Sequence, residues 1–166
     1  MDPSITIQTY QPQFQSQIVQ LILNIQQNEF GIPITAEDQP DLFIITDFYQ
    51  KGGGNFWVAT NEQKDVVGTI ALIKADEQIG AIRKMFVHTD YRGSIYGIAS
   101  KLLVELENWA LNKGLSDLYL GTIDLLKGAI KFYTKNGFKL IEVDQLPASF
   151  PRMKVDTLFY HKKITL

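Results

Sequence analysis

The sequence contains no cysteine, which excludes a disulfide, a thiolate nucleophile and a cysteine-based metal site. Its two histidines, His88 and His161, lie far apart in the chain, and this spacing argues against a zinc site rich in histidine. We therefore expect no bound metal.

Long hydrophobic runs are also missing. The longest ones, such as Leu42–Ile45 and Ile70–Ile73, are far too short to span a membrane. The start, Met1–Pro3, lacks the basic region followed by an apolar region that marks a secretory signal. These features predict a cytoplasmic protein that does not associate with a membrane.

Positive charge is absent from the first part of the chain. Residues 1–50 contain no Lys, Arg or His but six acids, whereas residues 51–166 hold all 16 Lys and Arg with the other 12 acids. The two parts therefore carry formal charges of −6 and +4. The net charge of −2 and the pI of about 5.7 argue against binding of nucleic acid through a large basic surface. The asymmetry suggests two different partners, unless glutamines simply supply the polar surface of the first part.

The length and composition are those of one globular domain, which we expect to span residues 1–166. Apolar residues make up 45% of the chain and charged residues 20%, enough to bury a substantial core. Period-two and period-3.6 patterns predict strands and helices along the whole chain. The expected strands are Ser4–Thr9, Phe56–Thr60, Val66–Lys74, Ala81–His88, Leu118–Thr122, Phe138–Val143 and Val155–Lys163; the expected helices are Gln11–Gln27, Gly97–Lys113 and Leu126–Lys135. This order predicts the α/β class, with one mixed sheet.

The most informative stretch runs from Lys84 to Leu103 and reads as a strand, a loop with glycine and the start of a helix. Free amides at a helix start, beside small residues, favour binding of an anion. Arg92 and Lys101 add positive charge there. The stretch has neither the Gly-Lys-Ser/Thr of a P-loop nor the G-x-G-x-x-G of a dinucleotide fold.

This stretch resembles the acyl-CoA pyrophosphate loop of the GNAT superfamily of N-acyltransferases, whose motif is Gln/Arg-x-x-Gly-x-Gly/Ala. Gly97-Ile98-Ala99 matches the end of the motif, while Ser94 stands where the family has Gln or Arg. The resemblance implies that the phosphates of CoA are bound at Arg92, Gly93, Ser94, Gly97, Ile98 and Ala99. It also implies that the strand at Met85, Phe86 and Val87 pairs with the pantetheine amides and offers an N–H to the thioester carbonyl.

A second stretch resembles the C-terminal GNAT motif. Leu120-Gly121-Thr122 is followed by Ala129-Ile130-Lys131-Phe132-Tyr133 and then by Gly137-Phe138. In the family the tyrosine that matches Tyr133 often protonates the departing CoA thiolate, so the resemblance implies that Tyr133 is catalytic. The alternative is that Tyr133 is a core aromatic on the apolar face with Ala129 and Phe132.

The two motifs occur in the family's order, and the resemblance covers nearly the whole chain. It implies a mostly antiparallel mixed sheet flanked by helices and a transfer of acetyl from acetyl-CoA to a primary amine of a small molecule, peptide or protein. Since there is no cysteine for an acyl-enzyme, we expect direct transfer in a ternary complex. Leu146-Pro147 to Tyr160 also resembles the end of a bacterial GNAT subgroup that carries Phe-Pro-x-Met-x-Val-Asp-Thr and has no assigned substrate. A homodimer is left open.

The general base is not identified by this comparison. Some GNATs carry a Glu where Ala81 stands here, so the candidates are Glu29, Asp124, His88 or an ordered water. Asp156 and His161 read as residues of a terminal strand.

Two other functions stay open: a non-catalytic acyl-CoA sensor or regulatory module, and an interaction domain that binds no CoA. On the acetyltransferase hypothesis, the −6 segment would face a cationic amine through acids such as Asp38 and Asp41, and the +4 remainder would meet the phosphates.

Overall fold

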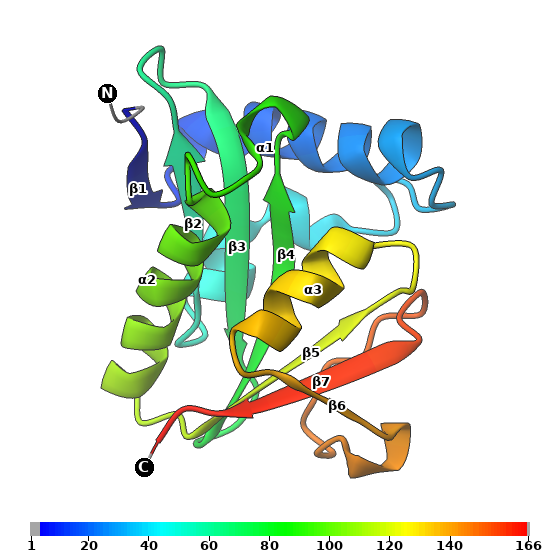
Figure 1. The fold of residues 1–166 in the computed structure, drawn as a ribbon. Helices are drawn as coiled ribbons and strands as arrows, with labels where there is room; N and C mark the ends of the chain where they lie inside the picture. Colours follow the sequence, from blue (N-terminus) through cyan, green and yellow to red (C-terminus); the bar gives the residue numbers. More distant parts are fainter. Residues whose placement is uncertain (1–3, 166) are drawn as a thin grey trace.

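A mixed β-sheet forms the centre of the computed structural model, which describes residues 4–165 (Figure 1). Within these residues the sheet has seven strands in the order β1-β2-β3-β4-β5-β7-β6, and every neighbouring pair is antiparallel except β4 and β5. The predicted fold class is therefore confirmed. The strands are β1 (Thr6–Thr9), β2 (Asn55–Thr60), β3 (Val66–Lys74), β4 (Ile79–Val87), β5 (Asp117–Thr122), β6 (Lys139–Ile141) and β7 (Leu158–Lys163).

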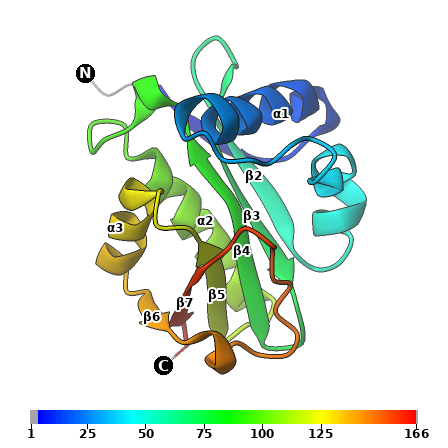
Figure 2. The same ribbon diagram turned by 90° about the vertical axis from the view of Figure 1, so that its right-hand side faces the viewer.

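Helices cover both faces of the sheet. Figure 2 shows α2 and α3 on one side of the strands, and α1 with the cyan segment containing η4 on the other. The α-helices are α1 (Gln15–Leu23), α2 (Ile98–Asn112) and α3 (Lys127–Lys135); shorter helical segments are η1 (Pro12–Phe14), η2 (Asn24–Glu29), η3 (Pro40–Phe43), η4 (Thr46–Gln50), η5 (Thr89–Tyr91) and η6 (Val143–Gln145).

Alternation along β2 gives each face its own core. Trp57 and Ala59 belong to the cluster under α2 and α3, whereas Phe56 and Val58 belong to the cluster under α1. Successive side chains of a strand point to opposite faces, so this strand is buried along its whole length. The sheet thus lies between two apolar cores.

A β-bulge interrupts the pairing of β3 with β4. Thr69 pairs with Phe86 and Ala71 with Arg83, so the β4 side has one extra residue. The bulge is centred on Lys84, whose φ is +56°. The buried Thr69 hydroxyl donates a hydrogen bond to the Lys84 carbonyl over 2.6 Å. A bulge bends a strand and changes the direction of its side chains.

β4 and β5 pair only at their starts. Their register runs from Ile79–Asp117 to Ile82–Leu120, although β4 continues to Val87. Beyond Ile82 this edge of β4 has no β5 partner, and α3 lies over the diverging ends of the two strands (Figure 1). Unpaired backbone groups of this kind can pair with an extended ligand.

Three predicted strands are longer than those observed. The first begins at Thr6 rather than Ser4. The last strand begins at Leu158 rather than Val155, because its pairing with β5 ends at Thr122–Leu158 and the preceding residues leave the sheet. The strand predicted at Phe138–Val143 covers only Lys139–Ile141, because Val143 starts η6. The predictions made from Met1–Pro3, and the outermost ends of the predicted domain, lie outside the described residues.

Candidate functional site

A cavity of about 430 Å³ lies between the end of β4, the loop that follows it and the starts of α2 and α3. The nine residues that the sequence predicts to bind CoA all line it: Met85, Phe86, Val87, Arg92, Gly93, Ser94, Gly97, Ile98 and Ala99. The structure thus brings the β4 edge and the loop together around one space. We call it the large cavity.

The start of α2 forms the polar wall of the large cavity. Gly97 has a φ of +61° and its carbonyl accepts the first helical bond, from the N–H of Lys101. The preceding N–H groups of the first turn have no acceptor within the helix and attract anions. Gly93 has a φ of +105°, and a Cβ there would meet nothing within 4 Å. Lys135 of α3 adds a positive charge to the lining.

Arg92 is held by contacts within the protein. Its Nε donates to the Val87 carbonyl over 2.8 Å, and its two terminal nitrogens donate to the Glu29 carboxylate over 2.5 and 2.7 Å. The hydrogen bond from Arg92 lowers the pKa of Glu29 below its ordinary value. Glu29 is therefore poorly suited to be a base, and a phosphate contact by Arg92 requires its release from Glu29.

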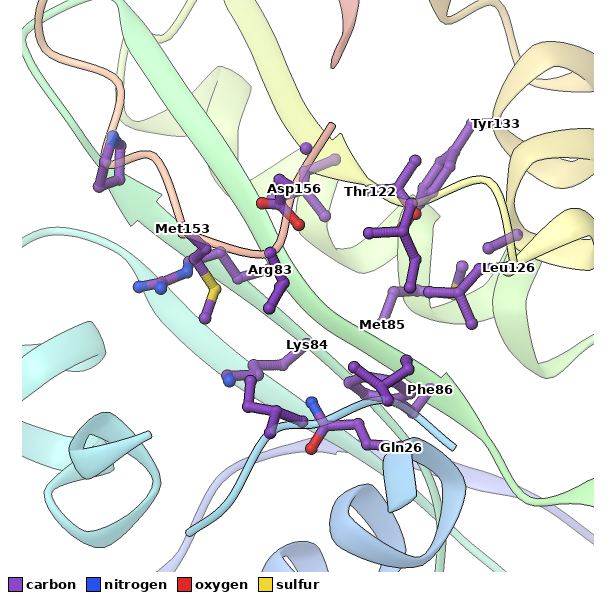
Figure 3. Close-up of a pocket in the computed structure, with 18 of the residues that line it drawn as sticks. Gln26, Arg83, Lys84, Met85, Phe86, Thr122, Leu126, Tyr133, Met153 and Asp156 are labelled. Carbon is purple, nitrogen blue, oxygen red and sulfur yellow. The ribbon is translucent and has the colours of Figure 1, made fainter. Parts of the chain in front are cut away.

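A second cavity of about 100 Å³ adjoins the first; we call it the small cavity (Figure 3). The two share Met85, Phe86, Leu126 and Ala129 as lining residues. The small cavity is also lined by the segment Phe150–Asp156 that precedes β7, through Phe150, Pro151, Met153, Val155 and Asp156. Two spaces that meet at the edge of β4 allow two ligands to touch there.

Tyr133 lies in the wall of the small cavity (Figure 3). Its ring packs edge-on against Phe138 and Phe132, with centroids 5.6 and 5.9 Å apart, and the residue is 6% exposed. Burial, with a smaller contribution from the charge of Asp156, raises the pKa of Tyr133. The hydroxyl therefore stays protonated at neutral pH and can donate. Both readings of Tyr133 fit, since it belongs to the core and faces the cavity.

Asp156 also lines the small cavity, although the sequence pattern placed it in a terminal strand. It lies against Gly121 of β5, where a Cβ would come within 2.5 Å of Asp156 Oδ2. Burial raises the pKa of Asp156 to about 6, and the nearby Arg83, Lys84 and Arg152 oppose that rise. Two sequence features could have pointed to Asp156: Gly121, which leaves space for its carboxylate, and the Phe150–Thr157 motif that contains it.

Two cations on β4 belong to the same wall (Figure 3). The Lys84 ammonium donates to Gln39 and lies 3.8 Å from Asp41. Burial lowers the pKa of Lys84 to about 8. The Nε of Arg83 is buried and has no hydrogen-bond partner within residues 4–165.

The other base candidates lie outside both cavities. Asp124 is exposed and pairs with Lys127 over 2.8 Å. His88 Nδ1 accepts the N–H of Asp90 over 3.1 Å. These contacts are those of a surface pair and of a turn cap.

Asp38 and Asp41 of the first segment line neither cavity. Asp38 accepts from the N–H and hydroxyl of Thr35 at 3.0 Å. Asp41 is 4% exposed and accepts from the Tyr49 hydroxyl at 2.5 Å. The structure therefore does not support a role of Asp38 and Asp41 in meeting a cationic acceptor.

Residues 4–165 offer no candidate for a membrane-spanning helix or for a metal-binding cluster. In that range no helix has both the length and the apolar character needed to cross a membrane. The same residues contain no group of three or more His, Asp or Glu placed to hold a metal ion.

The chain is similar to known acetyltransferases over most of its length. The model of the Acetyltransferase (GNAT) family matches residues 19–138. A crystal structure of a GNAT-family acetyltransferase from Staphylococcus aureus is 40% identical, covers 98% of this chain and 100% of that one, and superposes with a TM-score of 0.94. An acetyltransferase from Streptococcus agalactiae is 31% identical, covers 96% and 98%, and gives a TM-score of 0.91.

A curated relative is longer than this chain. The probable N-acetyltransferase 14 of Xenopus tropicalis is 31% identical over 123 residues, which are 74% of this chain and 59% of that protein. The chain thus spans a little over half the length of that relative.

Proposed function

The chain belongs to the GNAT acetyltransferase family, and from this premise we propose that it transfers an acetyl group from acetyl-CoA to a primary amine. The observation that carries the proposal is the meeting of the two cavities at Met85, Phe86, Leu126 and Ala129. The donor occupies the large cavity, the acceptor enters the small one, and the reacting groups meet at the edge of β4.

The large cavity suits a long anionic thioester. The free edge of β4 at Met85–Val87 can pair with amide groups, and the start of α2 with Gly93 and Gly97 can bind phosphate oxygens. Acetyl-CoA supplies the activated acetyl group. The backbone N–H groups of the β4 edge would stabilise the charge that develops on the carbonyl oxygen.

The small cavity supplies the groups for proton transfer. The Tyr133 hydroxyl is protonated at neutral pH and faces the space where the departing sulfur would lie. We assign it the role of hydrogen-bond and proton donor to that sulfur. With no cysteine in the chain, transfer is direct from donor to amine within a ternary complex. A cytoplasmic location stays a prediction of the sequence, and a homodimer stays open.

A thermal-shift titration followed by a thiol-release assay tests this function. Acetyl-CoA at 100 times its dissociation constant should stabilise the protein by about 2.7 kcal/mol, and an amine panel should then release free CoA thiol. Stabilisation without thiol release from any amine would favour the acyl-CoA sensor. An unchanged melting temperature with both CoA and acetyl-CoA would favour the interaction domain.

A further inference from the structure

The small cavity carries charges of opposite sign on two different segments. Arg83 and Lys84 come from β4, and Asp156 comes from the segment before β7 (Figure 3). Donor binding uses none of these three side chains. The Phe150–Asp156 segment forms part of the wall of the proposed acceptor site.

Lys84 is already neutralised within the fold. Its ammonium donates to Gln39 and lies beside the buried Asp41 carboxylate, which also accepts from Tyr49. These contacts hold Lys84 in the bulge of β4 and satisfy its charge. It is not available to a ligand without breaking a buried pair, which is costly.

Among the described residues, Arg83 has no carboxylate partner of this kind, although its guanidinium acts on the nearby Tyr49 hydroxyl. Within residues 4–165 it makes no ion pair with a carboxylate, and its buried Nε donates to no acceptor. Its guanidinium carbon lies 5.8 Å from the centroid of the Phe48 ring, a contact that favours a fixed cation. A buried donor left without an acceptor destabilises a protein, so an anion that enters the cavity gains a strong hydrogen bond. The planar fork of arginine matches a carboxylate.

Asp156 supplies the opposite charge. Its side chain makes no ion pair within residues 4–165, and Gly121 leaves the room for its carboxylate. The charged and titratable groups that face it are Arg83 and Lys84 from β4, Arg152 from its own segment and Tyr133 from α3. A carboxylate in this position can attract an ammonium and accept a proton from it.

We propose that the small cavity binds a compact amine that also carries a carboxylate, with the carboxylate on Arg83 and the amine beside Asp156, which acts as the general base. The inference rests on the proposed acetyltransferase function. The ammonium gives one proton to Asp156 and attacks the thioester carbon with the freed electron pair. As the C–N bond forms and the C–S bond breaks, Tyr133 gives its proton to the sulfur, and the second proton of the nitrogen passes to the Tyr133 oxygen and restores the hydroxyl.

The size and lining of the cavity define the acceptor further. The space is about 100 Å³, and Phe150, Pro151, Met153 and Val155 make part of its wall apolar. An acceptor of this chemistry is a free amino acid rather than a protein terminus, because the terminal amine of a protein lacks a free carboxylate beside it.

Calorimetry on the protein saturated with CoA tests the binding step. The probes are free L-amino acids and their carboxamides, compared pair by pair. We expect at least one free amino acid to bind ten or more times tighter than its own carboxamide. The Arg83→Gln variant should lose this preference while its affinity for CoA stays unchanged. The matched control is Lys139→Gln, which also removes one positive charge, since Lys139 is exposed on β6 and lines neither cavity. Equal binding of every pair, or a preference that survives in Arg83→Gln, would overturn the inference.

Thiol release with the same probes tests the role of Asp156. For the wild type the rate should fall as the pH drops below about 6, where Asp156 becomes protonated, and Asp156→Asn should be slower at least tenfold and lack that limb. A circular dichroism spectrum like that of the wild type shows that the variant is folded. An unchanged acidic limb in Asp156→Asn removes it as the base.

The two readouts separate the failures. Amino acids that bind through Arg83 without any thiol release refute the proposed function and leave the binding inference standing. Amines that are acetylated without regard to a carboxylate support the function and refute the inference. Absence of both binding and release refutes both.

Discussion

Tyr133 is a core residue and a cavity residue at once. Its ring packs against Phe132 and Phe138, while its hydroxyl faces the small cavity. Tyr133→Phe keeps the ring and removes only the proton donor. We expect turnover to fall about 100-fold, at the low end of acid–base contributions, and the dissociation constant of acetyl-CoA to stay within about twofold. Steady-state kinetics and calorimetry measure the two.

A matched control for this change is Tyr119→Phe. Tyr119 stacks on His161 with centroids 4.5 Å apart and lines neither cavity. The control should keep its turnover. Equal turnover of Tyr133→Phe and the wild type across pH would leave Tyr133 as a core aromatic without an acid role.

The partly buried Asp156 carboxylate is charged at neutral pH and destabilises the fold there. Its pKa in the folded chain is about 6, against 3.8 as the ordinary value. Between these values the folded state binds a proton that the unfolded state lacks, so this stabilisation is full below about pH 4 and is lost as the pH rises through about 6. Asp156→Asn does not titrate. At pH 7.5 it should be more stable than the wild type, by up to about 3 kcal/mol.

Urea unfolding at pH 4.5 and pH 7.5 measures this difference. The gap between the variant and the wild type should narrow at the lower pH. Asp144→Asn, at an exposed position of η6, controls for the loss of one carboxylate. An equal difference in the free energy of unfolding at both pH values would contradict a raised pKa of Asp156 in the folded state.

At the scale of the elements, the bulge in β4 depends on one buried hydroxyl. Thr69 is fully buried and donates to the carbonyl of Lys84 over 2.6 Å. Thr69→Val removes the donor and leaves the buried Lys84 carbonyl without this hydrogen bond. The loss should lower the free energy of unfolding by about 1–3 kcal/mol. Urea unfolding measures it. Thr69→Ser keeps the hydroxyl and should lose less; a serine variant as unstable as the valine variant would show that the methyl group matters instead.

The sequence predicts most elements because their periodicity is strong. The helix expected at Gly97–Lys113 and the strand at Val66–Lys74 both form within a residue or two of their predicted ends. The β4 bulge and the early separation of β4 from β5 have no such signal, because they follow from strand pairing at a distance. The prediction that Asp156 lies in the last strand is wrong for the same reason: the alternating pattern extends back to Val155, but β5 offers no partner before Leu158.

At the scale of the molecule, part of the charge asymmetry is neutralised by ion pairs inside the fold. Glu29 and Asp41 from the first segment pair with Arg92 and Lys84 from the second. Counts along the chain cannot show this, because ion pairs join residues that are distant in sequence. The two parts of opposite charge are held to each other, and the expectation of two separately charged ends of one cleft is not supported.

The Glu29–Arg92 pair gives a test of this view. Glu29→Gln removes the charge that holds Arg92, which lines the large cavity. A freed guanidinium can bind a phosphate, so we expect the dissociation constant of acetyl-CoA to fall about 2- to 5-fold at low salt, an effect of the size of one exposed charge pair. Calorimetry at low and high salt measures it, with the exposed Glu62→Gln as control. Weaker binding in Glu29→Gln would mean that the pair serves to position the loop.

The shared wall of the two cavities has one more consequence. Met85, Phe86, Leu126 and Ala129 contact whatever occupies either space, so each substrate alters the surface that the other meets. By thermodynamic linkage, any factor by which the donor changes the affinity for the acceptor must equal the factor in the reverse direction. The length of the acyl chain and the choice of amine are therefore not independent: an acyl group that reaches past these four residues takes room from the acceptor, and one fold can tune donor selectivity through its acceptor pocket.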